Sequence, residues 1–372
     1  LLALLAAVLA LGLPPPRVAG GALVWQSHEL LLGFGLAAVA GFVLTAVPEF
    51  TATASASPRT GRLLVLLWLL GRLGVWLSGA AGLPALALAA LAHLGLIGGL
   101  LILLLPALRT VAGRRQHAFG WALAALFLLA AGFYVDALRG QYPMRWLLAV
   151  LGLVMVLIIV AMSRISMRIV NRSIDEAGEG GAPYLARPPK RNLAILCIVL
   201  FTLAEFWHPG GRVSGWLACA AAAALCNLMG DWHVGRPLLR RWPFMLYAVY
   251  VCMALGYALI GTALLAGGPG ASAGRHLLTM GALGLSIYVV ISIAGRAHCG
   301  HPSDERPWVV QGALLIGAGA MLRAGAAFAP EAATALLGMA GMCWVGGFGL
   351  MALRMLPVLW GPRPDGGRGC EG

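Results

Sequence analysis

Residues 25–50 read WQSHELLLGFGLAAVAGFVLTAVPEF, an apolar segment that carries a histidine and a carboxylate near its start. About 20 apolar residues are enough for a helix to cross a bilayer. Because ionisable groups are costly inside a membrane, His28 and Glu29 indicate a functional site. Small residues follow Glu29 at every fourth position, a spacing that lets a neighbouring helix approach closely. This row predicts a buried helix face, and its members are Gly33, Ala37, Gly41 and Thr45.

The composition of the whole chain indicates a membrane protein. Of its 372 residues 60% are hydrophobic and only 10% are charged, whereas about 25% are charged in a typical soluble protein. No polar stretch is long enough to bury a core of its own, so we predict an all-α polytopic membrane protein with one transmembrane domain, residues 1–372. Its seven cysteines show no CxxC spacing, which favours neither a disulfide framework nor a zinc site.

The apolar runs predict about twelve transmembrane helices, separated in most places by proline or glycine. Residues 164–191 are expected to form a basic cytoplasmic loop between two halves of six helices. The first run looks like the remainder of a helix that starts upstream. The predicted helices are residues 1–13, 29–48, 62–80, 84–105, 118–138, 145–163, 192–208, 214–229, 243–264, 275–294, 308–328 and 332–354.

The basic residues predict the orientation of these helices. Of the 26 Lys and Arg residues, nineteen follow even-numbered helices, six follow odd-numbered helices, and Arg72 lies inside the third helix. Cytoplasmic loops are enriched in basic residues, so both termini are expected in the cytoplasm. The net charge of +13 then fits loops held against anionic lipids, and we predict no nucleic-acid partner.

Two histidines open predicted helices from the outer face in this orientation, His28 and His276. Neutral imidazole is a good ligand of copper and of haem iron. We expect Glu29 to orient such a ligand or to carry protons. The alternative is that His28 and Glu29 are interfacial polar residues that cap the start of a helix. Met280 lies one turn after His276, so a thioether and an imidazole could reach one metal ion; packing is the alternative.

Two further histidines are weaker candidates for metal binding. His93 lies near the middle of the fourth predicted helix and is either a ligand or a buried histidine that a carbonyl satisfies. His298 belongs to an HCGH sequence at a cytoplasmic helix end. That sequence matches no zinc-site spacing, so a solvated loop is the alternative.

The chain contains no nucleophile elbow, phosphate-binding loop or CxxCH haem-attachment motif. Any haem would therefore be held non-covalently. We predict no catalytic residue from the sequence, and whether the protein is an enzyme stays open.

The opening segment resembles the NnrS family, whose pattern there is approximately WHxHEMLFGFxxAxxAGFLLTAVPNWT. HLLTMGALGL at 276–285 is similar to the family's HALTVGAIGT, the GH and HP around His298 give a third match, and SRISM at 163–167 stands in place of GRVIP. The resemblance implies a twelve-helix protein of the bacterial inner membrane that contains haem b and copper. It also implies a role in nitric oxide stress, with nitric oxide as a ligand and His28 and His276 as haem ligands.

This chain departs from the family pattern at several positions. Gln26 replaces its first histidine, and Tyr247 stands in the ninth helix where another histidine is expected. These departures permit a second reading, a regulatory or structural membrane subunit without cofactors. A third reading is a secondary transporter or metal-handling permease, whose candidate path residues are Glu29, Glu49, Glu205 and Asp231.

Overall fold

The computed structural model describes residues 17–366 apart from 111–112, 114–115 and 179–182, and in this part of the chain helices occur without any β-strand. The all-α class predicted from the sequence is confirmed. The described residues divide into two compact units, 17–154 and 155–366. The sequence led us to expect a single domain. The division falls inside one continuous helix, α6 (Met144–Ala177).

Nine helices in the described residues are long and apolar enough to cross a membrane, so the chain is a multi-pass membrane protein. The predicted helix at 1–13 lies outside the described residues. The number twelve and the cytoplasmic termini stay predictions. The nine segments are Gly21–Thr51, Pro58–Leu108, His117–Leu138, Met144–Ala177, Arg212–Trp232, Arg241–Ala266, Gly270–His298, Trp308–Gly325 and Pro330–Trp360.

The first of these segments changes its helical pitch beside the candidate histidine. It begins as α2 (Gly21–His28), continues as a π-helix, η1 (Glu29–Gly35), and ends as α3 (Leu36–Thr51). A π-helix bonds each N–H to the carbonyl five residues back, so its turns are wider than α-helical turns. The side chains after η1 are therefore rotated relative to those before it.

This rotation overturns part of the small-residue row predicted from Glu29. Gly33 is buried, but Ala37 and Gly41 are exposed. The buried positions after η1 include Leu36, Ala40, Val43 and Val47. The face predicted to be buried is thus buried only up to the π-helix, because the four-residue spacing assumed an uninterrupted α-helix.

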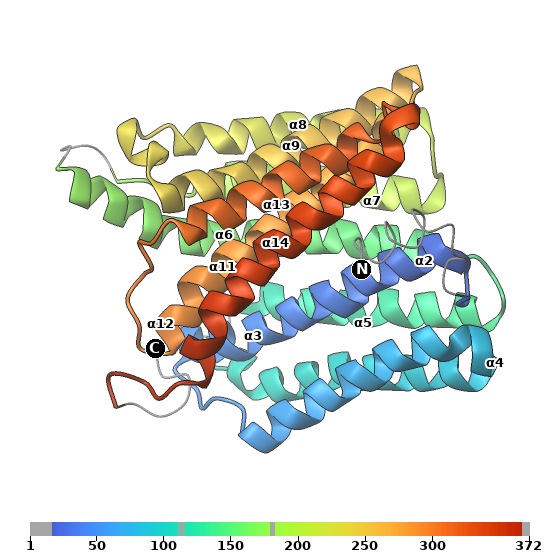
Figure 1. The fold of residues 1–372 in the computed structure, drawn as a ribbon, viewed down its shortest axis with the longest axis horizontal. Coiled ribbons are helices and arrows are strands. Elements are labelled where there is room, and N and C mark those ends of the chain that lie inside the picture. The colour runs from blue at the N-terminus through green and yellow to red at the C-terminus, as the bar shows by residue number, and fades with distance from the viewer. Residues whose placement is uncertain (1–16, 111–112, 114–115, 179–182, 367–372) are drawn as a thin grey trace. The chain divides into compact units, whose positions relative to one another are not determined.

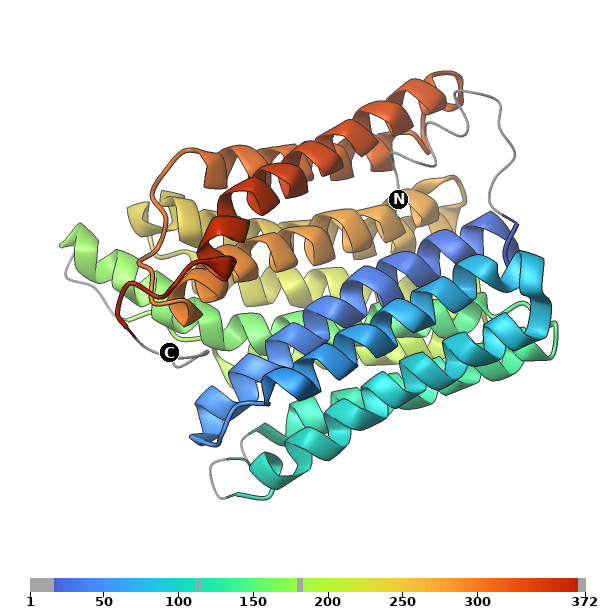
Figure 2. The ribbon, with the colours of Figure 1, turned by 60° about the horizontal axis from the view of Figure 1, so that its bottom comes forward.

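The second segment, α4 (Pro58–Leu108), is folded back on itself. It begins behind Ser57, whose hydroxyl accepts a hydrogen bond from the Thr60 N–H at 3.2 Å. A straight helix of its 51 residues would be about 76 Å long, more than twice the apolar thickness of a bilayer, about 30 Å. Gly82 interrupts it with φ 61° and ψ −140°, a conformation for which glycine is the natural residue. The two arms match the predicted helices 62–80 and 84–105 and run back along each other (Figure 2).

Helices α5 and α6 complete the first unit and lead into the second. α5 (His117–Leu138) packs against α4. α6 continues to Ala177, so residues 164–177 are helical and not part of the loop predicted from residue 164. Beyond the apolar core of α6 the buried residues keep helical spacing, which explains the continuation; they are Ser163, Ser166, Val170 and Ser173.

The second unit continues with α7 (Pro188–Trp207), α8 (Arg212–Met229) and α9 (Arg241–Ala266), each packed against the next. Two short 3₁₀-helices, η3 (Gly230–Trp232) and η4 (Arg236–Leu239), join α8 to α9. α7 is 20 residues long and carries Lys190, Arg191 and Glu205. It is not one of the nine segments that meet the criteria for crossing a membrane.

The remaining part of the second unit begins with a segment that contains two π-helical stretches. That segment comprises α10 (Gly270–His276), η5 (Leu277–Leu283), α11 (Gly284–Val290), η6 (Ile291–Gly295) and α12 (Arg296–His298). It is followed by α13 (Trp308–Gly325), the 3₁₀-helix η7 (Pro330–Ala332) and α14 (Ala333–Trp360), and Figure 1 shows α13 and α14 as neighbours.

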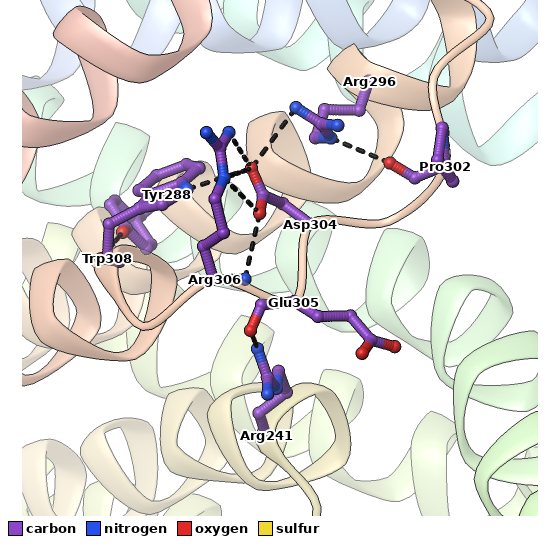
Figure 3. A network of polar contacts seen from close by, with 8 residues as sticks. All are labelled: Arg241, Tyr288, Arg296, Pro302, Asp304, Glu305, Arg306 and Trp308. Carbon is purple, nitrogen blue, oxygen red and sulfur yellow. Dashed lines mark hydrogen bonds and ion pairs between the residues drawn. The ribbon is translucent and has the colours of Figure 1, made fainter.

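A buried carboxylate holds together the connection between α12 and α13 (Figure 3). Asp304 accepts hydrogen bonds from Arg306 Nη2 at 2.5 Å and from Trp308 Nε1 at 3.0 Å, and Arg296 Nη1 lies 3.4 Å away. The hydrogen bonds from Arg306 in particular hold the pKa of the Asp304 carboxyl well below its usual range. Asp304 is therefore ionised at neutral pH, and its charge is neutralised where it lies.

Candidate functional site

A tyrosine links two buried histidines in the first unit. Tyr134 Oη lies 3.0 Å from His28 Nε2 and 2.5 Å from His93 Nδ1. The three side chains come from α2, from the second arm of α4 and from α5, and each is at most 1% exposed. The centroids of the two imidazole rings are 5.2 Å apart. Three polar atoms from three membrane-spanning segments therefore converge on one point.

The absence of a side chain at Gly71, on the first arm of α4, leaves space for the imidazole of His93 on the second arm. A Cβ built on Gly71 would lie 2.4 Å from His93 Nε2, which is far inside van der Waals contact. The imidazole therefore fills the space that a side chain at position 71 would occupy. His93 Nε2 is also one of the buried polar atoms with no hydrogen-bond partner in the described residues.

A buried ion pair adjoins this cluster. Arg72, on the first arm of α4, donates to Glu29 Oε2 from Nε at 2.8 Å and from Nη2 at 2.5 Å. The Glu29 side chain is 2% exposed and that of Arg72 is 34% exposed. The Arg72 guanidinium also stacks over Trp68, 4.8 Å from the ring centroid. This pairing explains how a carboxylate is tolerated within a membrane-spanning helix.

The hydrogen bonds in the cluster have one favoured direction, because the phenol of Tyr134 can donate only one proton. If Tyr134 donates to His28 Nε2, the His28 Nδ1–H points toward Glu29 Oε1 at 3.5 Å. His93 then donates from Nδ1 to Tyr134, and only a lone pair is left unsatisfied. The reverse direction would bury an N–H of His93 without an acceptor and set two acceptors, His28 Nδ1 and Glu29 Oε1, against each other. Since buried donors without acceptors are rare, the first direction is preferred.

The second unit presents His276 differently. It ends α10 and directly precedes the π-helix η5, as His28 directly precedes η1. No described residue forms a hydrogen bond or ion pair with its imidazole. The charged groups that act on it are Arg323 and Arg275. Arg323 Nε is buried and without an acceptor among the described residues.

The other predicted ligands lie in different surroundings. Met280 is 1% exposed and packs in an apolar cluster with Ala273, Leu277, Ala320 and Ala324. His298 ends α12, and its backbone carbonyl accepts a hydrogen bond from Arg363. The structure thus brings together His28, Glu29 and His93, all in the first unit, while Met280 and His298 lie at separate positions of the second.

The buried carboxylates proposed for a transport path are engaged in ion pairs. Glu205 lies 3.2 Å from Arg275 and also accepts the N–H of Gly210. Asp231 lies 2.8 Å from Lys190. With Glu29 bound to Arg72, each of these three has a basic partner. Glu49 is exposed. The arrangement of these carboxylates does not favour the hypothesis that the protein is a transporter.

Three residues of these sites were missed in the sequence, namely Tyr134, Arg72 and Arg323. Arg72 gave a usable signal, since it is a basic residue near the middle of a predicted helix, 62–80. Tyr134 gave none, because a tyrosine in an apolar helix is ordinary. Its separation of 106 residues from His28 put their contact beyond any local pattern.

The donor groups suit a haem better at His276 than at His28. Among the described residues, no group of three or more histidine, cysteine, aspartate or glutamate side chains could hold a metal ion. A haem needs fewer protein ligands than a metal ion does, since one imidazole can ligate its iron and an arginine can pair with a propionate. His276 and Arg323 supply these groups. His28 meets Tyr134 at one ring nitrogen and faces Glu29 with the other.

Comparison with known proteins gives one match, and it extends over nearly the whole chain. The family model described as NnrS protein matches residues 1–363. No curated protein and no solved structure matches the chain. The family match agrees with the resemblance found in the segments that begin at Trp25 and His276. Since the match covers far more than half of the sequence, the chain belongs to the NnrS family.

Proposed function

We propose that this protein binds haem b non-covalently and acts in the response to nitric oxide and nitrosative stress. Two observations support the proposal: membership of the NnrS family, and a histidine in a membrane-spanning segment whose imidazole no described residue engages. When bound, haem iron supplies a site at which nitric oxide can coordinate. Copper, which the resemblance also implies, prefers nitrogen and oxygen donors of the kinds found in the first unit.

The proposed iron ligand is His276. Its charged neighbours are Arg323 and Arg275, and Arg323 Nε lacks an acceptor that a propionate would supply. Arg275 is already paired with Glu205, so Arg323 is the better propionate partner. His28 is the less suitable iron ligand, because a haem bound there would have to displace the phenol of Tyr134 from Nε2.

The membrane arrangement is part of the same proposal. We infer twelve membrane-spanning helices in the bacterial inner membrane with both termini in the cytoplasm, where basic loops contact anionic lipid headgroups. The charge distribution supports this orientation. Reporter fusions test it: a fusion after Thr51 is expected in the cytoplasm and a fusion after Leu138 on the opposite side of the membrane. The reverse placement of the two reporters would contradict the orientation.

The haem assignment is tested with protein purified in detergent. The wild-type protein should show a Soret band that shifts when nitric oxide is added to the reduced protein. His276→Ala should lose the band, and Arg323→Gln should retain haem less firmly during purification. His208→Ala, at an exposed histidine of the same unit, is the matched control and should keep the band. An unchanged Soret band in His276→Ala would contradict the assignment of His276 as the iron ligand.

A further inference from the structure

We propose that a pocket in the second unit binds a phosphate group, carried by an anionic phospholipid or by a soluble ligand. The pocket lies where the apolar run of α6 ends and α7 begins, which the proposed orientation puts near the cytoplasmic headgroups. The inference does not depend on haem, and it goes beyond the contact of basic loops with lipid, which requires only net charge. The polar residues that line the pocket are Ser163, Tyr184, Arg187, Arg191, Asp231 and Tyr250.

The hydroxyl of Tyr250 is a buried donor without an acceptor. Tyr250 is 1% exposed, and no described residue forms a hydrogen bond with its hydroxyl. Its oxygen is not one of the fully enclosed polar atoms that lack a partner, so the hydroxyl is part of the small exposed surface of Tyr250, which faces the pocket. Because buried polar groups normally have partners, this hydroxyl indicates a ligand that supplies an acceptor.

The indole of Trp232 is a second donor next to the pocket. Its ring centroid lies 5.2 Å from that of Tyr184 and 5.7 Å from that of Tyr250. Trp232 is completely buried, and its N–H also lacks an acceptor among the described residues. In contrast, the Tyr184 hydroxyl is paired with Ser166 at 3.2 Å. Donors thus exceed acceptors here, which favours a ligand group that only accepts, as an ionised phosphate does.

Most charged side chains at the pocket are basic. Asp231, the one acidic residue among the described residues that line it, is already paired. Its carboxylate lies 2.8 Å from Lys190 Nζ and 3.7 Å from Arg187 Nε, and it accepts the backbone N–H of Arg187 at 3.2 Å. Asp231 therefore offsets only one of these two positive charges.

Arg191 supplies a charge that no described carboxylate balances. Its side chain donates from Nε and Nη2 to the neutral amide oxygen of Asn192, at 3.1 and 3.0 Å, and forms no ion pair with a described residue. The charge of Arg191 acts on Tyr250 and also on the guanidinium of Arg164. Since like charges repel, an anion bound near Arg191 would stabilise this arrangement.

The size of the pocket favours an anion with several oxygens. The space inside it is about 10 Å³, which is room for one water-sized group. One phosphate oxygen can enter and accept from Tyr250, while the others stay at the mouth with Arg191 and with Arg187, whose side chain is 67% exposed. Arginine suits this role because it can bind two phosphate oxygens at once. The N-terminal end of α7, at Pro188, adds partial positive charge.

Two probes test the proposal on delipidated protein in detergent. Inorganic phosphate is titrated by calorimetry, and phosphatidylglycerol is added and counted by native mass spectrometry, with zwitterionic phosphatidylcholine as the comparison. We expect one site per chain for at least one probe, with phosphatidylglycerol retained in preference to phosphatidylcholine if the source is lipid. Binding of inorganic phosphate alone would identify a soluble ligand, and binding of phosphatidylglycerol alone would identify a lipid.

Matched variants locate the bound group. Tyr250→Phe keeps the ring and should bind the probe at least about tenfold more weakly, because it loses a hydrogen bond to a charged group. Its unfolding temperature without ligand should not fall, since the hydroxyl has no protein partner. Arg191→Gln should weaken binding by a similar factor. Tyr247→Phe on the same helix and Arg236→Gln at an exposed arginine are the controls and should bind as the wild type does.

Two outcomes would overturn the proposal. One is a wild-type protein that binds neither probe. The other is binding that Tyr250→Phe leaves unchanged, which would show a general effect of net charge and no use of the pocket. Neither result relies on the folding of Arg191→Gln. Neither uses a haem signal, so failure of the haem assignment and failure of the phosphate site are distinguishable.

Discussion

His93 Nε2 occupies the place where Gly71 would carry a side chain, 2.4 Å from the position of a Cβ. Gly71→Ala should therefore displace the imidazole and weaken its hydrogen bond to Tyr134. We expect a loss of about 1–3 kcal/mol in the free energy of unfolding, the usual cost of overpacking, measured by thermal unfolding in detergent. Gly95→Ala on the same helix is the control. Its nearest neighbour would be Leu67 at 3.8 Å, so that variant should be neutral or slightly more stable. Equal effects at both positions would contradict the interpretation.

Tyr134 satisfies two buried imidazoles at once. Tyr134→Phe removes the hydroxyl and leaves His28 Nε2 and His93 Nδ1 unpaired, and each such loss costs about 1–3 kcal/mol. The unfolding temperature should fall clearly, whereas Tyr142→Phe, at an exposed tyrosine of the same unit, should leave it unchanged. A Tyr134→Phe protein as stable as the wild type would show that the cluster contributes nothing to folding.

The pair of Glu29 and Arg72 is expected to be strongly coupled. Arg72→Leu leaves a buried carboxylate without its cation, which should destabilise the protein by about 3 kcal/mol. The double variant Glu29→Gln with Arg72→Leu should recover much of this loss, because no unpaired charge remains. A double-mutant cycle of unfolding free energies measures the coupling. Simple additivity of the two single changes would argue against the ion pair.

Asp304 should make stability depend on pH at the acidic end. Its pKa is lower in the folded protein than the value of about 3.9 in an unfolded chain, so its charge stabilises the fold at all pH values above that. This contribution is lost as the pH falls from about 4 toward the folded pKa. Asp304→Asn should therefore lower the unfolding temperature at neutral pH, and its difference from the wild type should shrink below about pH 4. Asp175→Asn, at an exposed residue, is the control.

Much of the helical organisation could be predicted from the sequence. α5 was expected at 118–138 and runs over His117–Leu138, because apolar runs of bilayer length reflect a solvent constraint that acts on each helix separately. The break between residues 80 and 84 was also expected, and Gly82 occupies it. In contrast, the helical continuation to Ala177 was missed, since its polar and basic residues look like a loop unless the spacing of its buried residues is known.

The π-helices could not be predicted. No local pattern in residues 29–35 distinguishes a π-helix from an α-helix, since the choice depends on packing against other helices. For this reason the prediction that Ala37 and Gly41 are buried was wrong, since both residues are exposed. The candidate site was found in part. His28, Glu29 and His93 stood out because polar groups are rare in apolar helices, whereas Tyr134 and Arg72 reach them through contacts distant in sequence.

The fold-back of α4 at Gly82 also sets an order for assembly during synthesis. Glu29 precedes Arg72 by 43 residues, so the guanidinium emerges from the ribosome after its carboxylate partner has been made. His93 comes next and has to wait 41 further residues for Tyr134. The ion pair can therefore form while the chain is still growing, and the turn at Gly82 brings the second arm back against it. Insertion of α5 then completes a polar centre whose first half is already in the membrane.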